Sequence, residues 1–244
     1  MTALTKRRRK RAYRELRTVF TVLLASMCVL LSIGIFEDYK KLTRLSDMME
    51  EQSVVYADQI GDLPWNLTLV NQENPVQKDP AMELTTLSNG QRVDSRIYPD
   101  LQAMFDDARA QAVYPIVREG YRTHEEQKKI YRDRIFSYVL EGNGLSRAKK
   151  LAESWVAVPG TSEHELGLAI DINADGARSS NDEVYSWLAE NAWKYGFILR
   201  YPQGKEEVTG IDYEPWHYRY VGKEAAEKIH ETGLALEEYV SANR

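Results

Sequence analysis

Apolar residues recur at helical spacing in four stretches of the chain, and each stretch predicts an α-helix. In the first, Leu101, Met104 and Phe105 lie on one face. The second opens with Thr123 and Glu126, which have the spacing of a capping box. We expect these helices over residues 99–111, 123–142, 183–195 and 223–233.

Short apolar runs bounded by turn residues lie between the helices and predict strands. We expect the strands over residues 113–117, 166–172, 197–201 and 216–221. Alternation in the second strand places Ile170 and Ile172 on one face and Asp171 on the other. Helices and strands are mixed without a regular βαβ order, so the pattern predicts an α+β fold. Residues 63–95 are rich in Pro, Asn and Gly and predict irregular structure.

Near the N-terminus, a basic segment, residues 1–17, precedes nineteen uncharged residues, 18–36. As a helix these nineteen residues would span roughly 29 Å, close to the ~30 Å hydrocarbon core of a bilayer. The positive-inside rule places the basic segment in the cytoplasm. We therefore expect a single-pass signal anchor, with the rest of the chain extracytoplasmic. A cleaved signal peptide is the alternative, although the apolar stretch exceeds the usual length and no A-x-A site follows it.

The segment after the predicted anchor, residues 37–62, is polar and helix-prone. It predicts a stalk that carries a folded domain over residues 63–244. Leu42, Leu45 and Met49 have helical spacing within the stalk, so a weak dimerising seam is the alternative. Three positions are too few to establish a coiled coil.

Charge is distributed unevenly along the chain. Residues 1–36 hold eight of the 32 Lys and Arg residues but one of the 37 Asp and Glu residues, so the remainder carries a net charge of −12. Such an acidic domain would repel phosphate, which excludes a nucleic-acid binder that acts by general basicity. Cys28 is the one cysteine, which excludes an internal disulfide and a Cys-rich zinc cluster.

Two of the four histidines have neighbours that suggest chemistry. His164 precedes a predicted strand in which Asp171 is an acid among apolar residues, costly to bury unless paired or bound to a cation. Glu214 and His217 converge if Pro215 turns the chain between them. Two imidazoles and a carboxylate suffice for a catalytic Zn²⁺, and a further carboxylate can take the proton from its bound water.

The segment around His164 has two interpretations. Ser162 and Glu165 have the spacing of a capping box, which would begin a helix. Gly167 and the apolar run after it instead favour a loop that leads into a strand. The other two histidines, His124 and His230, lie in predicted helices beside charged residues, and we interpret both as surface residues.

These residues also form a pattern that resembles a known family. The sequence Ser162-x-His164-x-x-Gly167-x-Ala169-x-Asp171, followed by Glu214-x-Trp216-His217, is similar to the motifs of the VanY-type D-alanyl-D-alanine carboxypeptidases. These enzymes belong to a group of zinc peptidases that includes D-Ala-D-Ala dipeptidases and the hedgehog domain. Similar residues recur in order from residue 63 to residue 240. The resemblance implies a small antiparallel sheet flanked by helices.

The resemblance further implies one zinc ion per chain, with His164, Asp171 and His217 as its ligands. Glu214 would be the general base that activates the zinc-bound water, and then the acid that protonates the leaving amine. Arg122 would meet the scissile carbonyl as it becomes an oxyanion. Gln127 and Ser162 would lie in the substrate pocket.

On this resemblance, the expected function is removal of the C-terminal D-Ala from peptidoglycan stem peptides, in the wall or on a lipid-linked precursor. One alternative is an L,D-carboxypeptidase that acts on tetrapeptide stems. The other is a non-catalytic zinc module that binds the cell wall. The presence of Glu214 favours a catalytic role, because a silent relative could lack the base.

Overall fold

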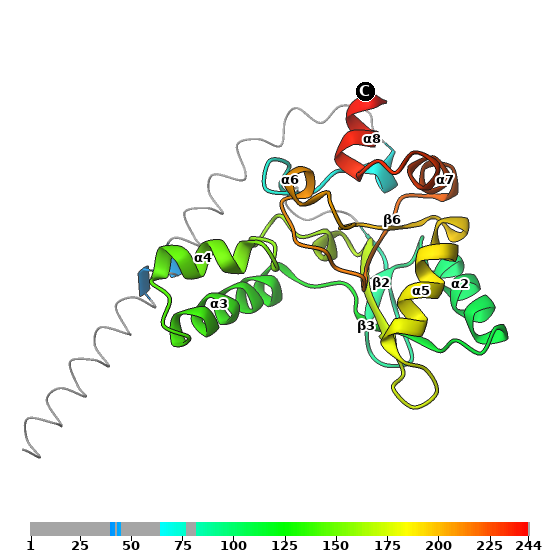
Figure 1. The fold of residues 1–244 in the computed structure, drawn as a ribbon, viewed down its shortest axis with the longest axis horizontal. Coiled ribbons are helices and arrows are strands. Elements are labelled where there is room, and N and C mark those ends of the chain that lie inside the picture. The colour runs from blue at the N-terminus through cyan, green and yellow to red at the C-terminus, as the bar shows by residue number, and fades with distance from the viewer. Residues whose placement is uncertain (1–39, 42, 45–63, 77–81, 244) are drawn as a thin grey trace, which may run out of the picture. The chain divides into compact units, whose positions relative to one another are not determined.

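A four-stranded antiparallel sheet lies at the centre of the folded domain (Figure 1). Its strands run in the order β3-β4-β6-β5, so strands distant in sequence lie side by side. The bounds are β3 Pro115–Glu119, β4 Ala169–Ala174, β6 His217–Tyr220 and β5 Phe197–Leu199. The predicted α+β class and antiparallel sheet are therefore confirmed, with strand ends shifted by a few residues.

The computed structural model describes residues 40–41, 43–44, 64–76 and 82–243. The predicted segments 1–17 and 18–36 lie outside these residues, as does most of the predicted stalk. The chain divides into two units, Met1–Met48 and Met49–Arg244, and the sheet belongs to the second. In the described part of the chain, no helix is both long enough and apolar enough to cross a bilayer.

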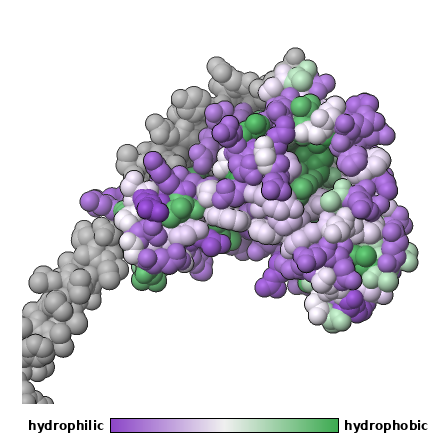
Figure 2. Space-filling view, in the orientation of Figure 1, coloured by the Kyte–Doolittle hydropathy of each residue, from purple (hydrophilic) through white to green (hydrophobic). Residues whose placement is uncertain are grey.

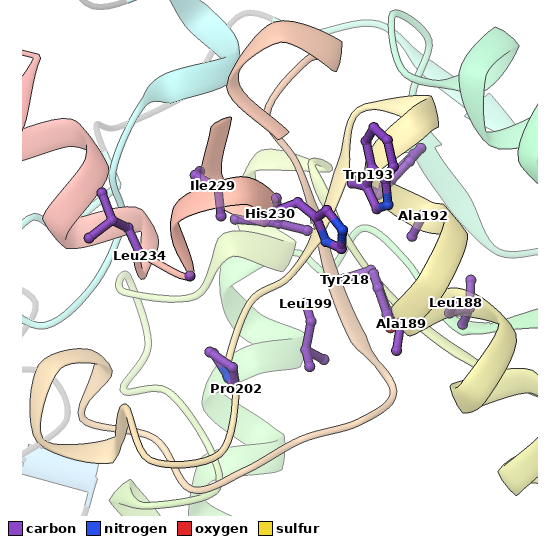
Figure 3. A pocket seen from close by; sticks show the side chains of 13 residues that line it. Leu188, Ala189, Ala192, Trp193, Leu199, Pro202, Tyr218, Ile229, His230 and Leu234 are labelled. Atoms are coloured by element: carbon purple, nitrogen blue, oxygen red, sulfur yellow. The ribbon is translucent and has the colours of Figure 1, made fainter. Parts of the chain in front are cut away.

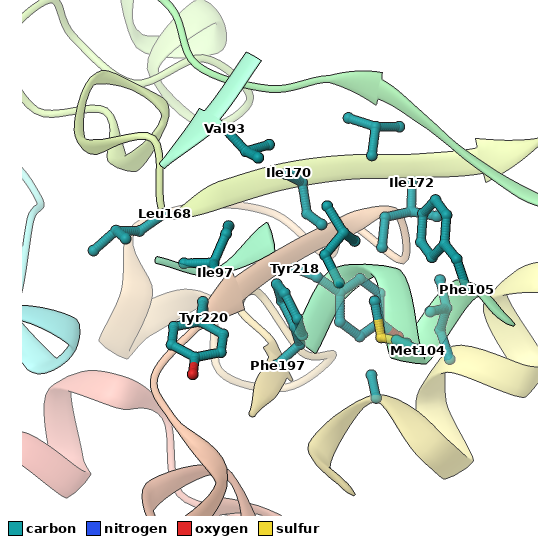
Figure 4. Close-up of a cluster of buried hydrophobic side chains, with 14 of the residues drawn as sticks. Val93, Ile97, Met104, Phe105, Leu168, Ile170, Ile172, Phe197, Tyr218 and Tyr220 are labelled. Carbon is teal, nitrogen blue, oxygen red and sulfur yellow. The ribbon is translucent and has the colours of Figure 1, made fainter. Parts of the chain in front are cut away.

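The two central strands separate an apolar face from a polar one. Ile170 and Ile172 of β4 and Tyr218 of β6 enter the main hydrophobic core (Figure 4). The alternate residues point to the opposite face, where the register pairs Asp171 with His217. Since side chains alternate along a strand, one β4–β6 ladder builds both the core and a polar site behind it.

Helices α2 (Tyr98–Ala110) and α5 (Asn181–Asn191) cover the apolar face with residues such as Met104, Phe105 and Leu188. The predicted helix over 183–195 is shorter than expected. After Asn191 the chain continues as a 3₁₀ turn, η4 (Ala192–Tyr195), and ends at Gly196, which has a φ of 85°. The bounds of α2 agree with the predicted helix over 99–111 to within a residue, and the predicted end at Gly196 is the end of η4.

Two further helices, α3 (His124–Leu140) and α4 (Leu145–Glu153), lie side by side on the far side of the sheet from α2 and α5 (Figure 1). The predicted capping box is present at the start of α3: the Thr123 hydroxyl accepts from the Glu126 backbone, and the Glu126 carboxylate accepts from that of Thr123. Helix α4 was not predicted. Its buried residues are Ala148 and Ala152, which lie one helical turn apart.

A second apolar cluster joins the C-terminal helices to the edge of the sheet. Helices α7 (Lys223–Thr232) and α8 (Leu236–Ala242) pack around Val221, Ile198 and Leu69. Leu69 follows a 3₁₀ turn, η2 (Trp65–Leu67), and the short α6 (Glu206–Thr209) contacts α8. The sequence pattern predicted α7 but not α8, which has one helical turn between its two buried residues.

The prediction of irregular structure over residues 63–95 is wrong in part. Strands β1 (Leu84–Thr86) and β2 (Arg92–Asp94) form an antiparallel hairpin there. The turn contains Asn89-Gly90, and Gly90 has a φ of 87°. Asn-Gly is a strong hairpin signal because both residues tolerate positive φ, but strands of three residues are too short for alternation to reveal them.

Candidate functional site

Three predicted ligands, His164, Asp171 and His217, lie together although they come from different elements. His164 lies in η3 (Glu163–Leu166), Asp171 in β4, and His217 begins β6. His164 Nε2 lies 3.4 Å and His217 Nδ1 lies 3.0 Å from the same oxygen, Asp171 Oδ1. One ligand atom from each of the three residues lies within 4.8 Å of the others.

This donor set fits a divalent cation such as Zn²⁺. Asp171 Oδ1 is buried and makes no hydrogen bond, although two imidazole nitrogens lie beside it. Burial alone would raise the pKa of the Asp171 carboxyl, but His164 and His217 hold it well below its usual range. A buried, ionised carboxylate oxygen beside two imidazole nitrogens suits a divalent cation, and three protein ligands would leave one position for a water molecule.

The short turn η3 orients His164. The chain enters β4 through Gly167, which has a φ of 67°, so the segment is a 3₁₀ turn and then a strand instead of one long helix. The Nδ1–H of His164 donates to the Gly120 carbonyl at 2.7 Å, which leaves Nε2 free to face Asp171. Burial, assisted by the charge of Arg122, lowers the pKa of His164 to about 4. The imidazole is therefore neutral at physiological pH, as a metal ligand must be.

The second imidazole, His217, differs in its protonation. Burial lowers its pKa, but the neighbouring carboxylates of Asp171 and Glu163 outweigh burial and raise the pKa to about 9. In the metal-free protein this imidazole thus carries a proton at neutral pH, and a metal that binds there must displace it.

A turn at Pro215 brings Glu214 back toward His217, as the sequence suggested. The His217 amide donates to the Glu214 carbonyl at 3.1 Å, and Glu214 Oε2 lies 3.7 Å from His217 Nδ1. Burial, followed by the charge of Asp171, raises the pKa of Glu214 to about 7 despite the opposing charges of His217 and Arg122. A carboxyl with a pKa near neutrality can both accept and return a proton.

Arg122 also reaches the site. Its guanidinium lies 3.4 Å from Asp171 Oδ2, and its side chain is 13% exposed. A second nitrogen donates to Gln127 Oε1 at 3.1 Å, while Gln127 Nε2 donates to the Ala157 carbonyl at 2.7 Å. Gln127 is fully buried and thus lies behind Arg122, where it holds the guanidinium in place.

These residues open onto a cavity of about 200 Å³. Ser162 lies on its wall, as do Arg122, Glu214 and the three predicted ligands. The rings of Trp155 and Trp216, which also line the cavity, stack with centroids 6.5 Å apart. Trp216 therefore both packs and faces the cavity. The volume and the lining fit a small substrate whose reacting bond lies near Asp171 and Glu214.

A buried cluster of charges behind His217 was missed by the sequence analysis. Glu163 lies between Arg200 and Arg219, and all three side chains are 0% exposed. Burial raises the pKa of the Glu163 carboxyl, but the two guanidiniums outweigh burial and hold the pKa well below its usual range. The available signal was Arg219, a charge within the apolar strand Tyr218–Tyr220, which has to find a buried partner.

One histidine interpretation needs correction. His124 was expected to be solvated, but its Nδ1 lies 2.9 Å from Oε2 of Glu165, which is buried. The other Glu165 oxygen accepts from the Gly160 amide at 2.9 Å. The pair thus connects the start of α3 to the loop before η3. His230 is exposed, as predicted, and stacks on Trp193 at 4.7 Å.

A second cavity, of about 210 Å³, lies on a different part of the domain and is lined mainly by apolar residues (Figure 3). Figure 2 shows a hydrophobic hollow next to α7 among otherwise hydrophilic side chains. Trp193 and Leu199 lie on its wall. Its lining residues include one histidine, His230, and no aspartate or glutamate. This cavity therefore lacks a cluster of histidines and carboxylates like the one that lines the first cavity.

Comparison with known proteins links the site to a described chemistry. A family model described as "VanY: D-alanyl-D-alanine carboxypeptidase" matches residues 90–223, which include every predicted site residue. A D-alanyl-D-alanine carboxypeptidase from Enterococcus faecalis is 53% identical over 203 residues, covering 83% of this chain and 76% of its own.

Solved structures agree with this match. VanYB in complex with D-alanine-D-alanine is 56% identical, with a TM-score of 0.73 over 74% of this chain and all of its own. A mutant VanY D,D-pentapeptidase from a VanB-type vancomycin resistance cassette, in complex with Zn(II), is 57% identical, with a TM-score of 0.71 over 72% of this chain and 99% of its own. The LdcB LD-carboxypeptidase is more distant, at 31% identity and a TM-score of 0.61 over 76% of this chain and 94% of its own.

Proposed function

Since this chain belongs to the VanY family of D-alanyl-D-alanine carboxypeptidases, we propose that it is a zinc D,D-carboxypeptidase that removes the C-terminal D-Ala from peptidoglycan stem peptides. The family match confirms the resemblance and the enzyme class predicted from the motifs. The observation that carries the proposal is the convergence of His164, Asp171, His217 and Glu214 on one cavity.

Three side chains would hold the metal: His164 through Nε2, Asp171 through Oδ1 and His217 through Nδ1. Zn(II) in the related VanY structure supports zinc as the ion. When bound, zinc would act as a Lewis acid and lower the pKa of a coordinated water from 15.7 toward about 7.

Proton transfer falls to Glu214. Its carboxylate faces the ligand cluster, where it can take a proton from the attacking water and return it to the leaving amine. The Arg122 guanidinium donates to the carbonyl oxygen as negative charge develops there. Gln127 fixes the direction of this guanidinium, and Ser162 lies on the cavity wall, where it can donate to the peptide.

The comparisons support D,D- over L,D-specificity. The related structure that contains D-alanine-D-alanine shares 56% of its residues with this chain, whereas the LD-carboxypeptidase shares 31%. The known L,D-enzyme nevertheless has the same fold, so tetrapeptide stems remain the second substrate to test.

We also propose that the enzyme acts outside the cell membrane, anchored by residues 18–36. The length of this uncharged stretch and the eight basic residues before it support the proposal. Peptidoglycan stem peptides lie on that side of the membrane, in the wall and on lipid-linked precursors. An anchored domain would meet both.

The decisive experiment is digestion of synthetic stem peptides by the full chain in detergent. We expect loss of one D-Ala from the pentapeptide, loss of this activity with a chelator, and its return with zinc. Glu214→Gln should reduce kcat by about 10²–10⁴-fold, the usual contribution of a general base, while zinc content is unchanged. Mass spectrometry of the products checks each expectation.

Three results would contradict the proposal. Cleavage of the tetrapeptide in preference to the pentapeptide would establish the L,D-activity. Zinc binding without hydrolysis of either peptide would indicate a non-catalytic wall-binding module. A Glu214→Gln variant with more than a tenth of the wild-type rate would exclude Glu214 as the base.

A further inference from the structure

The buried carboxylate of Glu163 has a free oxygen that faces a metal ligand. Its Oε1 pairs with Arg200 Nε at 2.8 Å and with an Arg219 terminal nitrogen at 3.0 Å. Its Oε2 lies 3.9 Å from His217 Nε2. Neither Glu163 Oε2 nor His217 Nε2 has a hydrogen-bond partner, and both atoms are buried.

The protonation of an imidazole ligand explains why these two atoms face each other. When His217 offers Nδ1 to a metal, its remaining proton must reside on Nε2. A buried N–H without an acceptor costs about 1–3 kcal/mol, so the ligand tautomer needs an acceptor on that side. Among the described residues, Glu163 Oε2 is the carboxylate oxygen that faces it. A closure of about 1 Å would bring the two atoms to hydrogen-bond distance.

We propose that Glu163 is a positioning residue for the metal site: it accepts the Nε2–H of His217, and so selects the tautomer and ring orientation in which Nδ1 binds zinc. The inference rests on the proposed zinc function and deepens it, because it assigns the group that orients one ligand. Such outer carboxylates raise the basicity of the imidazole and commonly change metal affinity by 10–100-fold.

The surroundings of Glu163 keep its second oxygen free for this purpose. Both arginines use Oε1, and each arginine also has a separate structural partner. Arg200 forms a two-pronged contact with Glu237 of α8, one prong at 2.9 Å, and Arg219 donates to the carbonyls of Asn66 and Thr68. A carboxylate needed only to neutralise the arginines would have no reason to present Oε2 to His217.

Replacing Glu163 by glutamine reverses the hydrogen bond at nearly constant volume. Arg200 and Arg219 are donors, so they retain the amide oxygen and turn the amide nitrogen, another donor, toward His217 Nε2. His217 is then driven to carry its proton on Nδ1, the atom that should bind zinc. Glu237→Gln is the matched control, because it removes one negative charge from the same cluster without facing His217.

The test measures zinc affinity of the full chain by competition with a chromophoric chelator, without any peptide substrate. We expect Glu163→Gln to bind zinc 10–100-fold more weakly than wild type, Glu237→Gln to stay within about threefold, and Glu163→Asp to recover part of the loss. Thermal unfolding of the metal-free variants separates loss of fold from loss of affinity.

Two results would overturn the inference while the zinc enzyme stands: unchanged affinity in Glu163→Gln, or equal weakening in Glu163→Gln and Glu237→Gln. A wild-type chain that binds no zinc would overturn this inference and the proposed function together. If Glu163→Gln does not fold, nitrogen-15 NMR of the zinc-loaded wild type decides. A protected His217 Nε2–H supports the inference, and a proton on Nδ1 refutes it.

Discussion

At the scale of single residues, two buried glutamates at this site have opposite properties because of their neighbours. Two guanidiniums flank Glu163 and keep it ionised. At Glu214, burial and then the charge of Asp171 raise the pKa of the carboxyl to about 7. Pairs of like groups whose pKa values diverge are typical of sites that divide acid–base and positioning roles. Residue type alone did not distinguish these two glutamates, but their environments do.

The raised pKa of Glu214 should destabilise the metal-free protein as pH increases. Between the ordinary value of 4.5 and about 7, the folded state holds a proton that the unfolded state has released, so the free energy of unfolding falls with rising pH. Glu214→Gln removes this contribution. In the metal-free protein, the free energy of unfolding of the variant relative to wild type should therefore rise by up to about 3 kcal/mol between pH 4.5 and pH 8.

Urea unfolding from pH 4.5 to 8 measures this effect. Glu190→Gln, on the exposed surface of α5, serves as the control and should leave the pH dependence of wild type in place. If the free energies of unfolding of Glu214→Gln and wild type change in parallel with pH, the pKa of Glu214 is not raised in the folded protein.

At the scale of elements, the spacing of apolar residues predicted the longer helices, while the shorter helices α4 and α8 and the β1–β2 hairpin were missed. The β1–β2 hairpin, which the sequence pattern did not predict, contacts the segment that carries Arg122. The Arg92 carbonyl of β2 accepts the Tyr121 amide at 2.6 Å, which holds the chain between Gly120 and Arg122 against the site. The Gly120 carbonyl in turn accepts from His164.

A side chain at residue 120 should therefore disturb the metal site through the hairpin. A Cβ there would lie 2.2 Å from the Arg92 carbonyl oxygen, so either β2 or the Gly120 loop must move. We expect Gly120→Ala to lower the free energy of unfolding by about 1–3 kcal/mol, as for other overpacked sites, and to weaken zinc binding.

Gly144→Ala is the control. A Cβ added at residue 144 would meet no atom within 4 Å apart from its chain neighbours, and the φ of −64° there suits any residue. Urea unfolding and zinc competition on the two variants provide the comparison. Equal stability and zinc affinity in Gly120→Ala and Gly144→Ala would show that the close contact with β2 is unimportant.

At the scale of the whole molecule, the acidic domain and the basic N-terminus are suited to different surroundings. The remainder after residue 36 carries a net charge of −12, and the domain surface in Figure 2 is largely hydrophilic. The eight basic residues of segment 1–17 favour an anionic cytoplasmic leaflet. These opposed charges agree with the proposed topology.

The proposed anchor over residues 18–36 predicts how the full chain partitions in cells. It should remain in the membrane pellet after alkaline carbonate extraction, and external protease should cleave the domain from intact wall-less cells. A variant lacking residues 1–36 should be soluble and protected inside the cell. Recovery of the wild-type domain in the medium, with a new N-terminus after residue 36, would establish a cleaved signal peptide instead.

Much of the candidate site could be predicted from the sequence, because two of its residue pairs are local and the resemblance to the VanY-type family implied the residue roles. His164 and Asp171 are separated by one turn and half a strand, and Glu214 and His217 by one turn. Such spacings survive in any fold that keeps those segments. The position of Gln127 behind Arg122 could not be read in this way, because it depends on how α3 packs against the loop at Ala157.

Sequence alone thus determined the α+β class, the longer helices and the residues that can bind a metal, because periodicity and short motifs act over a few residues. Tertiary structure alone decided that Glu163 meets Arg200 and Arg219, and that its free oxygen faces His217. These partners come from η3, the end of β5 and β6, and the antiparallel order β4-β6-β5 brings them together. No local pattern specifies that register, since it follows from burying one face of the whole sheet.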